Sequence, residues 1–280
     1  MSEKNVVQKD QFSTLKGRAV AGLLGEKSAK ILADKYVDLK VSGEHFLTSK
    51  GRANHAEIRR YKNLYAGQRC VIIGNGPSLR NTNLELLRNE ITFGLNRIYL
   101  MFDELGFETS HHVVVNELVV EQCADDFRKI KSPLFTTLEN RPHLEGCSHV
   151  RYLTGLGGPR FVGNVAHGIW VGGTVTYVAL QLAYYMGFAK VILVGVDHRF
   201  ADKGPANKVV VSAGPDQNHF DPRYFGAGFK WQLPDLETSE VAYELARRKF
   251  QASGRLVVDS TVDGALSIFP KVSLEEALGN

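Results

Sequence analysis

A short glycine-punctuated stretch, Gly74-Asn75-Gly76-Pro77-Ser78, has the residue types best suited to binding chemistry in this chain. It follows the apolar run 70–73, which predicts a buried strand leading into a tight turn. Its glycines let a ligand approach the backbone, and Asn75 and Ser78 offer hydrogen-bonding groups to a phosphate, ribose or base. Neither a dinucleotide fingerprint nor a Walker A loop is present, because no Gly-Lys-Ser/Thr follows. We predict a nucleotide-binding turn, with a purely structural turn as the alternative.

Polar residues also end three other apolar stretches. Asn96 follows 93–95, Asn116 follows 113–115, and Asp197 follows 191–196. In a parallel sheet the carboxyl ends of the strands share one edge, where ligands bind in open α/β folds. A single Asn at such a place is often only a cap, but three on one predicted edge favour a site.

The segment Gly173-Thr174-Val175-Thr176 opens an expected helix at 174–186. Small residues and hydroxyls at a helix N-terminus can bind an anion. The alternative is that Gly173 or Thr174 only caps the helix.

His219 is the histidine that we single out as a candidate general base. It lies in a long segment, 200–234, that shows no clear periodicity, and long irregular segments are often functional loops. A neutral imidazole can accept a hydroxyl proton near pH 7, although a lone loop histidine is usually a surface residue. The competing histidines are His111, His112, His149, His167 and His198.

The stretches around these residues alternate between strand and helix patterns, which predicts an α/β fold with a Rossmann-like, mainly parallel sheet covered by helices on both faces. The expected strands are 69–74, 91–95, 111–116, 133–137, 149–153, 190–196 and 255–259. The expected helices are 56–65, 97–105, 118–130, 174–186 and 236–252. We divide the chain into a helical N-terminal segment, 1–66, and a catalytic domain, 67–280; stretches 154–172 and 200–234 are expected to be loops.

Composition narrows the function classes. The 280 residues are 44% hydrophobic and contain three widely spaced cysteines, without an apolar stretch long enough to span a membrane or a signal sequence. We therefore expect a cytoplasmic protein. Residues 1–69 carry fourteen Lys and Arg against seven Asp and Glu, so this segment either contacts anionic lipid at the inner face of the membrane or is a solvated cap. The rest is not basic, so we expect no nucleic-acid partner.

The order of these motifs resembles one superfamily. Gly74-Asn75-Gly76-Pro77-Ser78-Leu79, then Asn96, Asn116, the 174–187 helix, Gly195-Val196-Asp197 and Asn218-His219 occur as they do in that group. It joins bacterial sialyltransferases that use CMP-activated sialic acid to proteins similar to archaeal 6-hydroxymethylpterin diphosphokinase, including the motility-accessory-factor glycosyltransferases. The resemblance covers about residues 67–270 and implies a variant of the GT-A-like fold.

The resemblance also implies roles for the strand-end residues. Asn75 and Ser78 would hold the phosphate and sugar of the nucleotide. Gly74 and Gly76, which flank Asn75, would belong to the same binding turn. Asn96 would contact the phosphate or ribose.

Further along the chain the resemblance implies that Asn116 faces the donor sugar. Thr174 and Thr176 would bind the cytidine or the donor carboxylate. Asp197 would lie beside the ribose or base, and His219 would deprotonate the acceptor hydroxyl.

The chain departs from the sialyltransferases after Asp197, where they place tyrosines that stabilise the leaving phosphate. Here His198, Arg199 and Phe200 follow, and Tyr224 is the nearest tyrosine candidate. Arg199 or Arg223 could neutralise the phosphate instead, because a guanidinium pairs well with phosphate.

These observations predict an inverting glycosyltransferase that transfers a sugar, such as a CMP-linked nonulosonate, to a glycan or glycoconjugate without a metal cofactor. The first alternative is a diphosphokinase that moves pyrophosphate from ATP to a pterin, with Mg²⁺ held by Asp197 and Asn116. The second is a non-catalytic nucleotide-binding scaffold. A homo-oligomer is compatible with the sequence, which names neither sugar nor acceptor.

Overall fold

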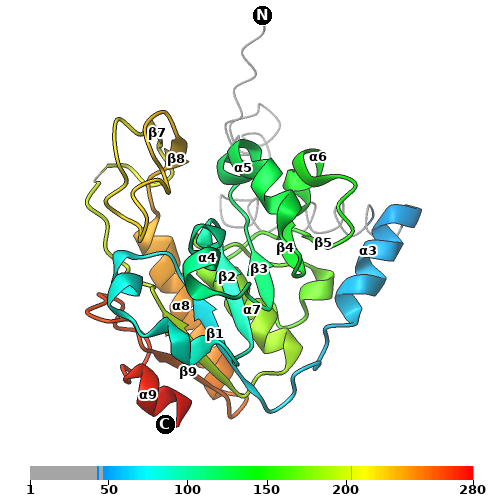
Figure 1. Cartoon of the computed structure of the whole chain (residues 1–280). Helices are drawn as coiled ribbons and strands as arrows, with labels where there is room; N and C mark the ends of the chain where they lie inside the picture. Colours follow the sequence, from blue (N-terminus) through cyan, green and yellow to red (C-terminus); the bar gives the residue numbers. More distant parts are fainter. Residues whose placement is uncertain (1–42, 44–46, 203, 280) are drawn as a thin grey trace, which may run out of the picture.

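A computed structural model describes residues 43, 47–202 and 204–279, so most of the predicted N-terminal segment lies outside the described residues. Seven parallel strands form one sheet in the order β5-β4-β3-β2-β1-β6-β9 (Figure 1). They are β1 (Arg69–Ile73), β2 (Thr92–Leu95), β3 (His111–Val113), β4 (Leu134–Thr137), β5 (Val150–Leu153), β6 (Lys190–Val194) and β9 (Leu256–Asp259). All seven predicted strands are present, and the α/β fold class is confirmed.

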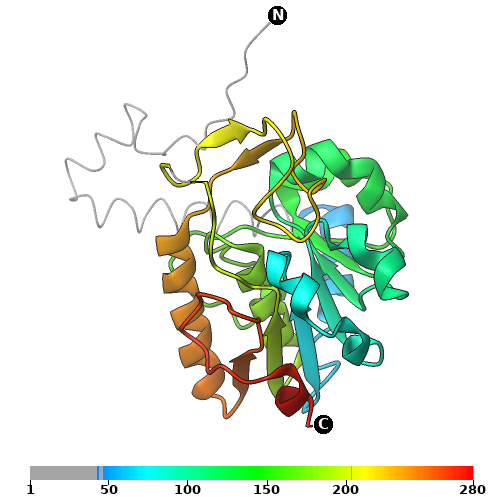
Figure 2. The ribbon, with the colours of Figure 1, turned by 60° about the vertical axis from the view of Figure 1, so that its left-hand side comes forward.

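Helices cover both faces of this sheet (Figure 2). One face packs against α3 (Ser49–Arg59), α7 (Val175–Met186) and α8 (Leu236–Gln251). The other packs against α4 (Phe102–Leu105), α5 (Glu117–Lys129), α6 (Arg141–Leu144) and α9 (Leu274–Leu278). Cys70 and Ile72 of β1 point into the first core and Val71 and Ile73 into the second. Burial on both sides explains why the strands are apolar throughout.

The helix expected at 56–65 is shifted toward the N-terminus. Its place is taken by α3, which begins at Ser49 and is followed by turns over 60–66. The Asn54 side chain exchanges two hydrogen bonds with the backbone of Tyr152, at 2.8 and 2.9 Å, and Ile58 is fully buried. These contacts fix α3 against the edge strand β5, so tertiary packing rather than local propensity determines where the helix lies.

The expected loop 200–234 contains an antiparallel pair that the sequence did not indicate, β7 (Val209–Val211) and β8 (Lys230–Gln232). A stack of rings supports it, in which Phe225 lies against both Phe229 and Trp231. The loop expected at 154–172 is irregular, and the buried Gln181 of α7 holds it by hydrogen bonds to the backbone of Val162 and Trp170.

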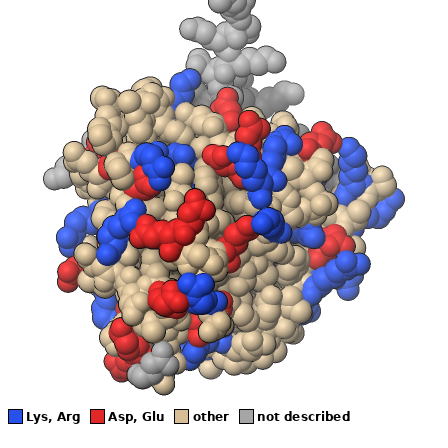
Figure 3. Space-filling model, in the orientation of Figure 1, with Lys and Arg blue, Asp and Glu red and all other residues tan. Residues whose placement is uncertain are grey.

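None of the described helices is long and apolar enough to cross a membrane. Figure 3 shows Lys and Arg interspersed with Asp and Glu on one face of the molecule, without a broad area of one sign.

Candidate functional site

The site is built at the point where the chain reverses its direction across the sheet. Strands β2 to β5 lie on one side of β1, and β6 lies on the other. A crevice at the carboxyl ends of the strands beside such a reversal is the usual ligand site of open α/β sheets. The junction of β1 and β6, which we call the switch point, is therefore where the fold predicts a site.

Glycines allow the two strand ends to meet closely there. The Gly74 and Gly76 amides donate to the carbonyls of Val194 and Gly195, at 2.8 and 2.9 Å. A Cβ at Gly74 would lie 2.2 Å from the Gly195 carbonyl oxygen. Gly74 is thus required by the contact between the strands, as well as by any approach of a ligand.

A clasp between Ser78 and Asp197 closes the switch point. The Ser78 hydroxyl and amide donate to the Asp197 carboxylate at 2.6 and 3.1 Å. A Cβ at Gly76 would lie 1.7 Å from one of those carboxylate oxygens. Three predicted residues, Gly76, Ser78 and Asp197, are therefore brought together. The Asp197 carboxylate can accept from Ser78 only because Gly76 has no Cβ in that space.

The His219 segment lies directly over this junction. The Phe220 amide donates to the Asn75 carbonyl at 2.9 Å, and the Arg80 side chain donates to the Phe220 carbonyl at 3.0 Å. The residue before Phe220 is His219, so the predicted base is held close to the predicted nucleotide turn by the backbone of its neighbour.

The His219 ring is held in one orientation. Its Nδ1 lies 2.8 Å from a carboxylate oxygen of Asp216, and its ring stacks on Tyr224 with the centroids 3.9 Å apart. Its Nε2 has no hydrogen bond to the described residues. A carboxylate on Nδ1 favours the tautomer whose Nε2 accepts a proton.

Asp216 was not singled out from the sequence. Burial tends to raise the pKa of its carboxyl, but hydrogen bonds from His219 and from the Asn218 and Phe225 amides outweigh burial and lower the pKa. Asp216 therefore stays ionised beside the imidazole. The sequence did contain a signal for this role, because Asp216 lies only three residues before His219.

Tyr224 does not occupy the position that we expected for a residue contacting phosphate. It is fully buried beneath His219, its hydroxyl accepts from the Arg97 amide at 3.4 Å, and its side chain lies against Asn96. Burial raises the pKa of the phenol. In this arrangement Tyr224 supports the imidazole rather than reaching a ligand.

The two arginines proposed for phosphate neutralisation differ in their surroundings. Arg199 is exposed, and its guanidinium has no partner among the described residues. Arg223 is exposed but pairs with the buried carboxylate of Asp221 at 2.6 Å. Arg199 is therefore the freer of the two.

Asn116 serves as a helix cap, the alternative reading. Its side-chain oxygen accepts from the Val119 amide at 3.3 Å, and its amide donates to Gln232 of β8 at 3.1 Å. It lies at the carboxyl edge of the sheet, as predicted, but it contacts the β7–β8 pair instead of the clasp.

The start of α7 is likewise capped and covered. The Thr174 hydroxyl accepts from the Thr176 amide at 3.3 Å and lies 3.4 Å from the Tyr243 hydroxyl of α8. Gly173 faces the Asp235 carbonyl at the beginning of α8, and Thr176 is buried. The start of α7 thus packs against α8, and these residues make no direct contact with the clasp.

Two side-chain oxygens just beyond β1 and β2 are buried without a partner among the described residues: Oδ1 of Asn75 and Oδ1 of Asn96. Ile73 pairs with Gly94, and Asn75 and Asn96 each lie two positions beyond that pair. A buried acceptor without a donor is costly. Both asparagines are therefore suited to a ligand that brings hydrogen-bond donors beneath the His219 segment.

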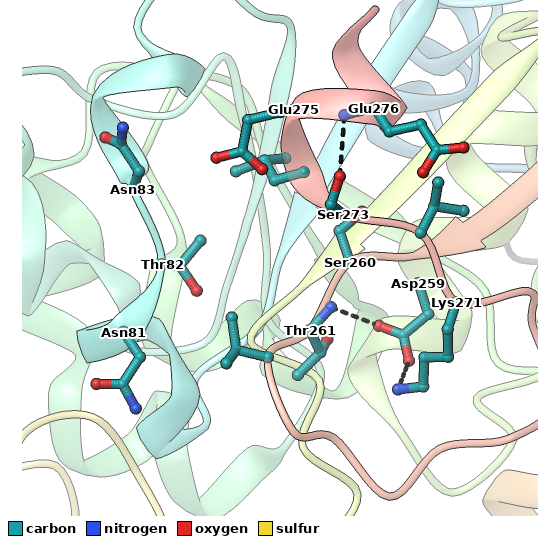
Figure 4. Close-up of a pocket in the computed structure, with 13 residues that line it drawn as sticks. Asn81, Thr82, Asn83, Asp259, Ser260, Thr261, Lys271, Ser273, Glu275 and Glu276 are labelled. Carbon is teal, nitrogen blue, oxygen red and sulfur yellow. Dashed lines mark hydrogen bonds and ion pairs between the residues drawn. The ribbon is translucent and has the colours of Figure 1, made fainter. Parts of the chain in front are cut away.

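Two hollows are found among the described residues. One of about 390 Å³ lies between residues 81–83 and the end of β9, where Asp259 pairs with Lys271 at 2.5 Å (Figure 4). Its other charged residues, Glu275 and Glu276, leave it with an excess of negative charge, which disfavours phosphate. A second, of about 790 Å³, lies between α5 and residues 214–229. The predicted nucleotide residues line neither hollow.

The described residues contain no cluster of three His, Cys, Asp or Glu side chains suited to a metal ion. Asp197 is engaged by Ser78, and Asn116 by α5 and β8. The neighbouring His198 pairs with Glu240 at 3.1 Å rather than with Asp197. A Mg²⁺ ion bound here would be coordinated chiefly by substrate phosphates.

The sheet and its switch point define a Rossmann-like α/β protein. Residues 46–203 match the family model described as 6-hydroxymethylpterin diphosphokinase MptE-like. This match spans more than half of the chain, which therefore belongs to the MptE-like family.

No curated protein matches the chain. Among solved structures it is similar to a MAf glycosyltransferase from Magnetospirillum magneticum AMB-1, with a TM-score of 0.48 and 13% identity. That likeness covers 78% of this chain and 38% of the other, so the chain spans well under half of the solved protein.

Proposed function

We propose that this protein is a glycosyltransferase that uses a nucleotide-activated sugar, with a CMP-linked nonulosonate such as sialic acid as the donor and a glycan or glycoconjugate as the acceptor. The observation that carries the proposal is the Asp216–His219 pair, which leaves Nε2 available beside the switch point. Family membership and the order of the sequence motifs support it. An oriented imidazole is well suited to accept the proton of a hydroxyl group near pH 7.

In the proposed reaction the acceptor oxygen attacks the anomeric carbon of the donor as Nε2 of His219 takes the hydroxyl proton. The bond from that carbon to the CMP phosphate oxygen breaks, and the configuration inverts. Asp216 stabilises the imidazolium that forms. The departing CMP carries the negative charge, which Arg199 and backbone N–H groups would stabilise.

The proposal is tested by incubating the protein with a panel of CMP-, UDP- and GDP-sugars and measuring transfer. We expect His219→Ala to lower the transfer rate by about 10² to 10⁴-fold while CMP binding is kept, because general base catalysis contributes that much. The matched control is His167→Ala, an exposed histidine outside the site. Wild-type transfer by His219→Ala would remove the mechanism.

The family description supports a second candidate, pyrophosphoryl transfer from ATP to a hydroxymethylpterin. This reaction would require Mg²⁺, whereas a monophosphate leaving group needs a metal less. Thermal shift measurements with CMP and with ATP, each with and without Mg²⁺, separate the two. Stabilisation by Mg²⁺-ATP and none by CMP would favour the diphosphokinase.

A further inference from the structure

The hollow of about 790 Å³, which we call the cleft, lies between α5 and residues 214–229. These residues belong to the same segment that carries His219, and α5 and β8 lie side by side in Figures 1 and 2. The segment thus has two sides. Phe220 faces the nucleotide turn, and Arg223 and Phe229 face the cleft.

The charges of the cleft leave one cation without a counterion. Its charged lining residues are Arg97, Asp126 and Arg223. Arg223 pairs with Asp221 at 2.6 Å, and Asp126 pairs with Lys129 at 3.3 Å.

Arg97 itself has no carboxylate partner among the described residues. It is part-buried, and burial of an unpaired cation is unfavourable unless other groups compensate.

The hydrogen bonds of Arg97 use two of the three guanidinium nitrogens, Nε and Nη1. Its Nε donates to the Tyr99 hydroxyl at 3.0 Å, and that hydroxyl donates to Asp126 at 3.3 Å, so Asp126 reaches Arg97 only through Tyr99. Its Nη1 donates to the carbonyls of Arg223 and Tyr224. Its Nη2 has no hydrogen-bond partner among the described residues. The neighbouring Cys123 thiol gives no negative charge, because burial raises its pKa. The side chain is therefore held rigidly by neutral groups and keeps one edge for a ligand.

We propose that the cleft binds the acceptor substrate and that Arg97 recognises an anionic group of it, a carboxylate or a phosphate. A planar guanidinium fixed by its other donors is well suited to such a group. The segment that lines the cleft also carries His219, so an acceptor bound in the cleft would lie next to the segment that holds the base. The acceptor assignment rests on the proposed function, but the anion site does not.

The test changes the charge of the cleft without touching Arg97 or the His219 contacts. Ala227 is exposed and lines the cleft, so Ala227→Glu adds a competing carboxylate there, with Ala227→Gln as the neutral control of the same size. Binding of inorganic phosphate and of N-acetylneuraminate is measured by calorimetric titration at one ionic strength. We expect the Glu variant to weaken the preferred anion by about tenfold and the Gln variant to leave it unchanged.

A second pair of variants tests Arg97 directly. Arg97→Met should weaken the same anion by about tenfold or more, because charged hydrogen bonds are lost. Arg88→Met is the matched control, since Arg88 pairs with Glu85 on the surface away from the cleft. Preference for phosphate or for the sugar carboxylate identifies which group the acceptor carries.

Equal binding by all variants, or no binding of either anion, would overturn the anion site. CMP binding, measured in parallel, separates the two proposals. If Ala227→Glu weakens CMP as much as phosphate, the cleft belongs to the nucleotide and the acceptor assignment is wrong. If no variant binds CMP while the anions respond as expected, the proposed function fails and the anion site stands.

Discussion

At the scale of single residues, two carboxylates organise the site by accepting several hydrogen bonds each. Asp197 accepts hydrogen bonds from the hydroxyl and the amide of Ser78. Asp216 accepts from His219 and from two backbone amides. An ionised carboxylate is the side chain that can accept this many donors at once. Asp197 therefore holds Ser78 in place, and Asp216 holds His219.

Replacement of Asp216 by Asn should show its contribution directly. At pH 7 we expect the free energy of unfolding to fall by about 3 kcal/mol, because buried donors lose a charged acceptor. The folded-state pKa of Asp216 is lowered, so its contribution is complete above about pH 5 and disappears as the pH falls through that lowered pKa. Urea unfolding of both proteins from pH 7 to pH 3 checks this, and a difference that grows toward acid pH would contradict it.

At the scale of elements, the junction between β1 and β6 depends on glycines, because a Cβ atom there would collide with the neighbouring strand end. Gly76 has an ordinary extended backbone, with φ of −68°, so it is not glycine for conformational reasons. It is glycine because the Asp197 carboxylate occupies the space of its Cβ. The clasp is thus encoded jointly by a residue after β1 and a residue after β6.

Gly76→Ala should therefore displace Asp197 and break both of its hydrogen bonds to Ser78. We expect a loss of about 1 to 3 kcal/mol of stability from overpacking, together with loss of CMP binding. Gly226→Ala is the control, because the nearest atom to its Cβ would be 3.8 Å away. Thermal unfolding and calorimetry measure both effects; equal behaviour of the two variants would show that the clasp is dispensable.

The elements also show which features the sequence could predict. Strands such as β2 and β6 are buried, so their apolar runs are unambiguous, and the carboxyl-edge placement of Asn96 and Asp197 followed from them. The β7–β8 pair was missed because its strands have three residues each and depend on the ring stack around Phe225.

Arg97 was missed for a related reason. Its significance comes from Tyr224, which is distant in the sequence and is brought close only by the fold. The capping roles of Asn116 and Thr174 were foreseen only as alternatives, since a cap and a ligand-binding residue share the same residue types.

At the scale of the whole molecule, the centre of the sheet contains two buried histidines that connect the site to acid stability. His111 and His112 are nearly inaccessible, and burial lowers the pKa of each to about 4. His112 donates from Nε2 to the Asn96 carbonyl, while its Nδ1 is buried without a partner. A proton added to Nδ1 would have no acceptor, so the folded protein keeps both rings neutral.

This arrangement predicts a loss of stability in mild acid. Each folded-state pKa lies below the unfolded value of about 6.5, so unfolding takes up protons between about pH 6.5 and pH 4, and stability falls as the pH falls through that range. The slope should be about 1.4 kcal/mol per pH unit for each histidine. In urea unfolding, His112→Gln, which keeps a donor for Asn96, should remove one such contribution, whereas His167→Gln, at an exposed position, should leave the slope unchanged. Equal slopes for the wild type and His112→Gln would mean that folding does not lower the pKa of His112.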